Sequence, residues 1–135
     1  MKNKKFLLLI SVIILSLSAC ADNPALKEGF KNTGNSIDRL IHGVFYAQID
    51  QTTIYQVNAA TTNVIDSNDS YYISQNVIHK NSSTITGTTK NTKEVFNIEM
   101  KQSGNTVNIY IKIGTFGDKS ASVDLLSKIR SNLGI

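Results

Sequence analysis

The sequence predicts an α+β domain in which two helices cover one face of an antiparallel sheet of about five strands. The segments at 94–102 and 106–114 alternate apolar and polar residues, which is typical of strands with one buried face and one wet face. The segments at 54–66 and 119–135 instead carry apolar residues at helical spacing. Elements with one apolar face each must bury it against another element. We therefore expect a two-layer sandwich in the order strand, helix, four strands, helix.

The first strand is expected in the β-rich run "GVFYAQI" (43–49). A helix from about Ile54 to Asp66 should follow it, because Thr53 and Gln56 have the spacing of a capping box. "SND" ends this helix. Its apolar face is predicted to contain Ile54, Val57, Ala60, Thr61, Val64 and Ile65.

Four strands and a second helix complete the prediction. The strands are expected at 71–80, 83–89, 94–102 and 106–114, and "SGN" (103–105) joins the last two as a tight hairpin. In the closing helix, Asp124 and Lys128 form an i,i+4 pair on the wet side. The apolar stripe of this helix contains Leu125, Leu126, Ile129 and Leu133.

The N-terminus has the pattern of a signal peptide. "MKNKK" provides positive charge, and the apolar run from Phe6 to Leu17 is shorter than the ~20 residues that span a bilayer. Small residues then lead directly into Cys20, the only cysteine, in the stretch "LSAC". A thiolate is a strong nucleophile. We expect cleavage between Ala19 and Cys20, with lipid attached to the cysteine.

"LSAC" resembles the lipobox of bacterial lipoproteins. The resemblance implies a diacylglyceryl thioether and an N-acyl group on Cys20, and two or three chains hold a protein stably on a membrane. Ala21, rather than Asp, follows the cysteine. By the sorting rule of that family, this implies the outer membrane, facing the periplasm. The chain then divides into a signal peptide (1–19), a lipidated tether (20–42) and a domain (43–135). For 36–41, a short helix and a flexible spacer both remain open.

Composition excludes several classes of function. Three of the 14 basic residues lie in the signal and no acidic residue does, so the mature chain of 116 residues carries 11 basic and 10 acidic groups. A nearly neutral chain without a Lys/Arg stripe is not expected to bind nucleic acid. With Cys20 lipidated, no thiol remains for a disulfide or a cysteine metal site.

The loop "GTFGDKS" (114–120) lies between a strand and a helix, as a phosphate-binding loop does. Only two residues separate Gly114 from Gly117, where a P-loop needs four, and Asp118 places a negative charge at the phosphate position. We expect a glycine turn in which Asp118 or Ser120 caps the helix. His42 and His79 lie far apart in sequence without a third ligand at metal spacing, so no metal site is expected.

The remaining candidates for function lie on the wet face of the sheet. Tyr110 is predicted there between Asn108 and Lys112, as an interaction surface or as ordinary cross-strand packing. The sequence contains no "GxSxG" motif, and its ten acidic residues are scattered singly. We therefore expect no catalytic residues and no enzyme. The full set of tyrosines considered for a binding surface is Tyr46, Tyr55, Tyr71, Tyr72 and Tyr110.

Four stretches carry a family resemblance: "FYAQIDQTTIYQVNAATTNVI", the "GTT" at 87–89, "VNIYIKIGTFGD" and "SVDLLSKIRSNL". They resemble short proteobacterial lipoproteins with a domain of unknown function. The resemblance covers about 43–133 and the lipobox, and it departs in the tether, which is polar here rather than rich in Gly and Ala. The layout is also similar to the helix-grip domains of outer-membrane assembly lipoproteins. The positions that match the motifs of the short lipoproteins are Gly114, Gly117 and Asp118, then Ser122, Leu125, Leu126, Ile129 and Leu133, whereas the likeness to the helix-grip domains is one of layout alone.

These features predict a non-enzymatic, lipid-anchored module of the outer membrane that binds or scaffolds an envelope protein or a cell-wall partner. No cofactor is expected beyond the lipid on Cys20. An alternative is a carrier or sensor of a small apolar ligand held between sheet and helices. Its basis is the strip of β-branched residues that faces the two helices, although these residues could simply pack the core.

Overall fold

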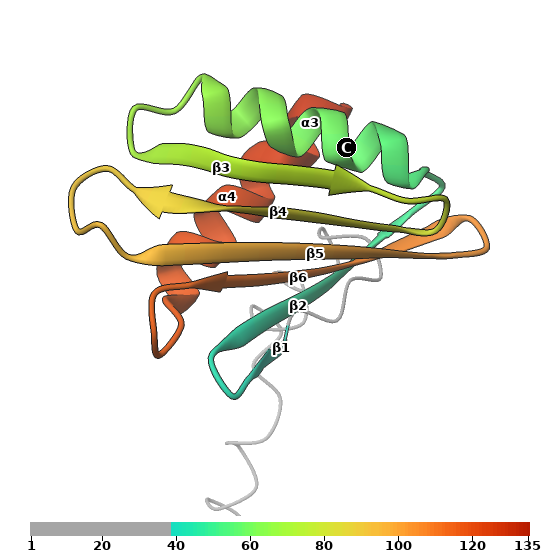
Figure 1. Ribbon diagram of the computed structural model, residues 1–135. Coiled ribbons are helices and arrows are strands. Elements are labelled where there is room, and N and C mark those ends of the chain that lie inside the picture. The colour runs from blue at the N-terminus through green and yellow to red at the C-terminus, as the bar shows by residue number, and fades with distance from the viewer. Residues whose placement is uncertain (1–38) are drawn as a thin grey trace, which may run out of the picture. The chain divides into compact units, whose positions relative to one another are not determined.

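A computed structural model describes residues 39–135, and its elements follow the predicted order (Figure 1). The predicted signal peptide (1–19) and residues 20–38 of the predicted tether (20–42), with Ala19 and Cys20, lie outside the described residues. Neither helix of the described part has the length and hydropathy needed to cross a membrane. The elements are β1 (Arg39–Ile41), β2 (Val44–Asp50), α3 (Ile54–Asp66), β3 (Tyr71–Ile78), β4 (Ser82–Thr89), β5 (Val95–Ser103), β6 (Thr106–Ile113) and α4 (Lys119–Leu133).

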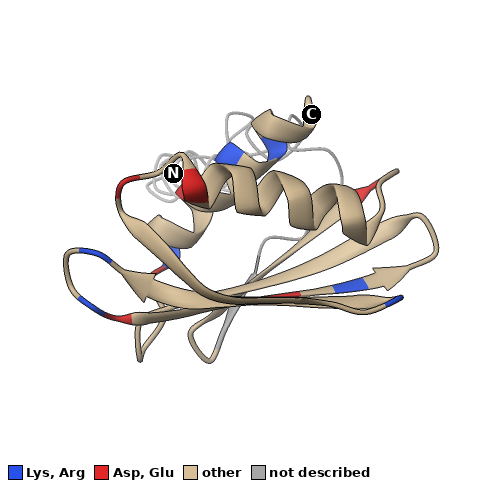
Figure 2. Ribbon diagram, turned by 45° about the horizontal axis from the view of Figure 1, so that its top comes forward, with Lys and Arg blue, Asp and Glu red and all other residues tan. Residues whose placement is uncertain are grey.

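The strands form one antiparallel sheet in the order β1-β2-β6-β5-β4-β3. Both helices lie on the same face of this sheet, as Figures 1 and 2 show together. α3 contacts β3, β4 and β5, whereas α4 contacts β6 and β2, and the two helices contact each other. The predicted α+β sandwich is therefore confirmed, with one strand more than the five expected.

The additional strand, β1, corrects the reading of 36–41, because Arg39–Ile41 is neither helix nor free spacer. His42 and Gly43 both have positive φ, 51° and 78°, which is the combination that a two-residue I′ hairpin turn requires. The turn folds β1 back onto β2. Gly43, the predicted first residue of the domain, is therefore a turn residue between two strands of the sheet.

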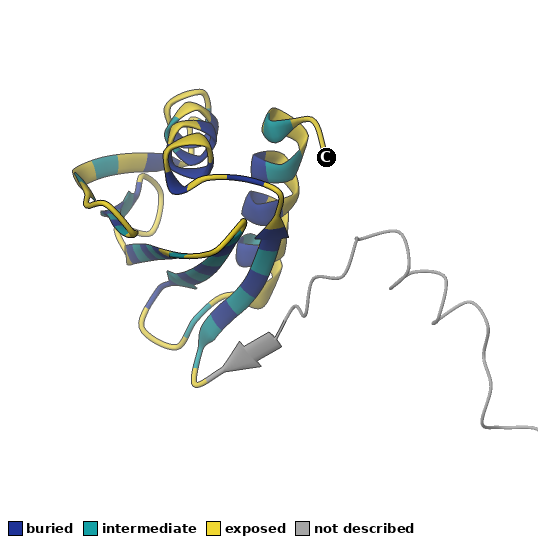
Figure 3. Ribbon diagram, turned by 90° about the vertical axis from the view of Figure 1, so that its right-hand side faces the viewer, coloured by how far each residue is buried: buried dark blue, intermediate teal, exposed yellow. Residues whose placement is uncertain are grey.

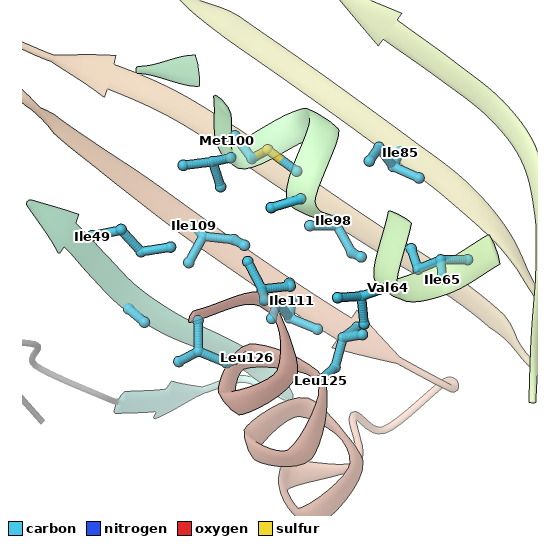
Figure 4. Packing of buried hydrophobic residues seen from close by; sticks show 14 of the residues in the cluster. Ile49, Val64, Ile65, Ile85, Ile98, Met100, Ile109, Ile111, Leu125 and Leu126 are labelled. Carbon is cyan, nitrogen blue, oxygen red and sulfur yellow. The ribbon is translucent and has the colours of Figure 1, made fainter. Parts of the chain in front are cut away.

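The core lies between the sheet and the helices (Figure 3). The predicted alternation of β5 and β6 is confirmed, since every second residue is buried along β6 and along the middle of β5. The predicted faces of α3 and α4 are buried as well, apart from Leu133, which is half-buried. Figure 4 shows how sheet and helix side chains meet, among them Ile98, Ile109, Ile111, Val64, Leu125 and Leu126.

The N-terminus of α3 is held twice. In the predicted capping box, the Thr53 side chain accepts from the Gln56 amide, and the Gln56 side chain accepts from the Thr53 amide at 3.0 Å. Gln102 of β5 reaches the same point, because its Oε1 accepts from the Ile54 amide at 2.6 Å. Its Nε2 donates to the carbonyls of Thr52 and Gly104. The β5–β6 hairpin therefore fixes where α3 begins.

The turn between β6 and α4 is tightly constrained. Gly114 and Gly117 have φ of +76° and +79°, and Asp118 is the N-cap residue, accepting from the Ala121 amide at 2.9 Å. The turn packs against the β1–β2 turn so closely that a Cβ added at Gly43 would lie 2.8 Å from the carbonyl carbon of Phe116. The two turns can meet only because both carry glycine.

A bulge in β3 creates a polar contact with α3 that the sequence pattern did not indicate. Ser74 is the extra residue, because Ile73 pairs with Gly87 and Gln75 with Thr86. The bulge turns Asn76 toward α3, where its amide exchanges hydrogen bonds of 2.9 and 3.1 Å with Asn58. Asn58 also donates to Ser83 at 2.6 Å. This satisfied network pins α3 to the edge of the sheet.

The close approach of Gly117 to Gly43 gives the first prediction. Gly117→Ala should lower the free energy of unfolding by at least about 3 kcal/mol, because its Cβ would overlap the Gly43 backbone. Gly104→Ala is the matched control, since Gly104 has φ of +58° but no atom within 4 Å, and it should cost about 1 kcal/mol. Equal losses in urea denaturation would contradict the packing of the two turns.

Tyr71 gives a second prediction, on pH. Its ring lies edge-on to Phe96, with centroids 5.6 Å apart. Burial, and secondarily the charge of Asp124, raises the pKa of Tyr71 above its ordinary value of 10.0. The unfolded chain therefore loses this proton more readily than the folded protein does.

As pH rises above about 10, ionisation of Tyr71 should favour the unfolded state, and its contribution to stability should be lost. Tyr71→Phe removes that term. The difference in free energy of unfolding between the native protein and this variant should therefore change between pH 8 and pH 11, in favour of the variant. Parallel stability curves would show that Tyr71 does not contribute to the alkaline transition.

Candidate functional site

The face of the sheet opposite the helices is uncovered by any described element (Figure 2). Three adjacent strands, β2, β6 and β5, place a patch of aromatic, amide and charged side chains at its centre. Register brings Tyr46 opposite Tyr110 and Gln48 opposite Asn108. On the other side of β6, Tyr110 lies opposite Glu99 of β5. We call this set the open-face patch: Tyr46, Gln48, Glu99, Lys101, Asn108, Tyr110 and Lys112.

Asn108 organises the patch. Its Oδ1 accepts two hydrogen bonds, from the Tyr46 hydroxyl at 2.9 Å and from Gln48 Nε2 at 3.0 Å. The Tyr46 and Tyr110 rings pack at a tilt of 42° with centroids 5.1 Å apart. These contacts hold the side chains of the patch against one another, and a preorganised surface loses less entropy on binding.

The charged members of the patch lie on β5 and β6, beside the tyrosine pair. Lys101 Nζ lies 5.3 Å from the centre of the Tyr110 ring, within cation–π range. Asn97 Nδ2 donates to Glu99 at 3.2 Å, and Asn97 Oδ1 is buried without a hydrogen-bond partner in the described part of the chain. Lys112 lies opposite Asn97 in the register. The patch thus offers both signs of charge beside an aromatic pair.

The structure brings the predicted residues Asn108, Tyr110 and Lys112 together on one face of β6. It separates the other tyrosines. Tyr71 lies in the core at 9% exposure, so its inclusion in a binding surface was wrong. Tyr55 lies on α3, on the helix side of the molecule. Tyr72 lies on the far edge strand β3.

The sequence predicts the members of the patch that lie on β6, but it does not predict an interaction surface that includes residues of β2 and β5. Tyr46 was considered only as one of five tyrosines, and Gln48, Glu99 and Lys101 were not proposed for a surface. The missing information was that β2, the first strand of the predicted domain, pairs with β6, the last. Alternation shows which face a residue occupies but not which strand lies beside it.

The chemistry available to this patch is recognition. Hydroxyl, amide and ammonium groups can donate hydrogen bonds, hydroxyl and amide oxygens can accept them, and the paired rings provide an apolar surface. Among residues 39–135, no three His, Asp or Glu residues are grouped so that they could hold a metal ion. His42 and His79 are both exposed and lie in the β1–β2 and β3–β4 connections. Gly114, Gly117 and Asp118 form the turn between β6 and α4 and are not part of the patch.

A family model described as "Protein of unknown function (DUF3568)" matches residues 4–132. The match covers nearly the whole chain, so the chain belongs to this family. We find no match among curated proteins. The resemblance to a family with a domain of unknown function is thereby confirmed, whereas the lipoprotein character and the proteobacterial origin stay predictions.

The role of Asn108 gives the third prediction. Asn108→Ala should lower the free energy of unfolding by about 1–2 kcal/mol, because Tyr46 and Gln48 lose their acceptor. The loss should be partly shared with Tyr46→Phe in a double-mutant cycle, since one hydrogen bond is common to both variants. Lys112→Ala is the control on the same strand and should change stability by less than about 0.5 kcal/mol. Fully additive losses would contradict the coupling.

Proposed function

We propose that this family member is a lipid-anchored binding module of the bacterial envelope, held on the periplasmic side of the outer membrane by Cys20. The open-face patch is the surface that receives its partner, an envelope protein or a cell-wall component. The observation that carries the proposal is the ordered aromatic and amide cluster on a sheet face that the helices leave uncovered. Binding or scaffolding, rather than catalysis, is the proposed activity.

Support for the anchor comes from the N-terminal sequence. A basic start, an apolar run too short for a bilayer and small residues before Cys20 together match the chemistry of a lipobox. The family match begins at residue 4, so this segment belongs to the sequence that the family shares. Two or three acyl chains on Cys20 would hold the protein stably on the membrane.

Support for the binding face comes from its composition. Tyr and Arg are enriched and Lys is depleted at protein interfaces, so the tyrosine pair is the part of the patch best suited to anchor a partner. Lys101, Lys112 and Glu99 then surround the pair with charge, as a polar rim does. The β-sheet backbone beneath the patch keeps all these side chains in register.

The carrier alternative finds less support. A ligand between sheet and helices would have to occupy the space of residues such as Ala47, Ile98 and Ile109, each with an exposed fraction of 0%. All three belong to the core cluster, in which Ile98 and Ile109 of the sheet lie with residues of both helices such as Val64 and Leu126 (Figure 4). A ligand would need to displace them, which costs several kcal/mol in a close-packed core.

The anchor gives the fourth prediction. In cells fed a palmitate analogue, the native protein should carry the label and begin at Cys20 by mass spectrometry of the intact chain. Cys20→Ala should be unlabelled and should keep residues 1–19, because the lipidated thioether is what the signal peptidase of lipoproteins requires. An unlabelled native protein, or one cleaved at another position, would overturn the anchor.

The binding face is tested by cross-linking in intact cells followed by mass spectrometry. A partner of the open-face patch should be captured by the native protein and by Tyr55→Ala, which removes an exposed tyrosine on the helix side. Tyr110→Ala should lose most of that product at equal protein level. Capture that survives Tyr110→Ala but fails with Tyr55→Ala would place the partner on the helices and overturn the proposed face.

A further inference from the structure

We propose that the domain contacts the phospholipid surface through one end of its sheet, with Phe116 inserted at the level of the headgroups. This inference rests on the proposed anchor at Cys20, and it adds an orientation that the anchor alone does not provide. The end in question, called the loop end here, includes the β1–β2 turn (42–43), the β4–β5 loop (90–94) and the turn before α4 (114–118). The α3–β3 connection (67–70) lies at the same end, where the Lys90 amide donates to the Ser70 carbonyl at 2.8 Å.

Hydrogen bonds and close packing hold the β1–β2, β4–β5 and β6–α4 connections side by side. The Gly114 amide donates to the carbonyl of Val95 at 2.9 Å, which joins the turn before α4 to the start of β5. The Glu94 side chain lies against Gly114, where an added Cβ would be 3.0 Å from Oε1. Gly43 packs on the carbonyl of Phe116. Figure 1 shows the three connections at the same end of the sheet.

Exposed apolar side chains gather at this end. Phe116 is 92% exposed, the most exposed large hydrophobic residue of the described chain, although its turn is tightly constrained. Val95 and Tyr72, exposed by 65% and 63%, lie at the same end on the outer face, one on each side of Thr88 of β4. Phe116, Val95 and Tyr72 are called the apolar row here. A constrained turn that holds an aromatic ring in water is suited to inserting that ring into an apolar surface.

The charges at this end fit a headgroup region. Lys90, Lys93 and Lys119 are exposed around the apolar row, and long lysine side chains can reach lipid phosphates while apolar groups insert. Four acidic residues lie at this end. Glu94 accepts a hydrogen bond from the Thr92 hydroxyl at 3.0 Å and Asp118 accepts one from the Ala121 amide, whereas Asp66 and Asp69 are exposed at and after the end of α3. Because the signs nearly balance, the apolar row rather than net charge supplies the contact.

The path of the chain favours a lipid occupant over a protein one. β1 leads directly into the β1–β2 turn, so the chain enters the domain one short strand away from the loop end. The 18 residues between Cys20 and Arg39 can extend no further than about 60 Å. Tethering of this kind raises the local concentration of the bilayer at the domain, so a weak contact is occupied.

The test uses tryptophan fluorescence, because the native chain contains no Trp. The lipidated Phe116→Trp protein is reconstituted into vesicles of phosphatidylethanolamine and phosphatidylglycerol, with and without brominated acyl chains. Tyr55→Trp is the matched control, since Tyr55 is 59% exposed but lies in the first turn of α3, at the opposite end of the sheet. The Phe116→Trp protein should shift its emission to the blue and lose at least half of its intensity to brominated lipid. The Tyr55→Trp protein should show neither effect.

Four results would overturn the inference. Unquenched emission from Phe116→Trp protein that floats with the vesicles would remove the contact while leaving the anchor intact. Equal quenching of the two variants would remove the orientation. A blue shift that depends on protein concentration without vesicles would assign the loop end to a second copy of the chain. Lipidated protein that fails to float would overturn the proposed anchor, and the inference with it.

Discussion

The pairing of β2 with β6 is the contact on which the other features of this domain depend. It joins the first long strand of the described chain to the last, across about sixty residues, as the register of Gln48 with Asn108 shows. On the inner side it places Ala47 opposite Ile109 in the core. On the outer side it builds half of the open-face patch. A slip of one residue would exchange the two sides and bury tyrosines in place of isoleucines. The core and the patch are therefore specified by the same register.

The two helices support that register by contacting different strands of the sheet. α3 carries the chain from β2 to the far edge strand β3, and Gln102 fixes its start to the β5–β6 hairpin. The hydrogen-bonded amides of Asn58 and Asn76 then hold α3 against β3. A buried Asn58 amide without a partner would cost more free energy than an apolar contact would contribute. α4 closes the remaining half of the core above β6 and β2. Polar contacts thus choose the position of each helix, and apolar burial supplies most of the stability.

Sequence patterns located α3 at its observed bounds and the strands within about two residues, because each is strongly periodic and bounded by caps or turns. They failed where a tertiary contact overrides the local pattern. The glycine after His42 suggested that the domain begins there, so β1 was not predicted. The bulge at Ser74 reverses which residues of β3 face the helices after that point. The patch was half visible for a related reason, since Asn108 and Tyr110 alternate correctly but their partners on β2 belong to a distant part of the chain. Alternation within a strand is local information, whereas strand order is not.

Under the two proposals, the domain contacts the membrane and its partner through different parts of the same antiparallel sheet. The loop end lies at the termini of the strands, whereas the open-face patch extends along the outer face from Gln48 and Asn108 to Lys112, next to the last residue of β6. A domain that rests on the bilayer by its loop end would therefore point its strands away from the membrane and present the patch sideways, with Lys112 nearest to the lipid. A partner that also lies on the membrane could then meet the patch by lateral diffusion. The constrained turn at Phe116 would matter for binding without contacting the partner, because it would set the direction in which Tyr110 faces.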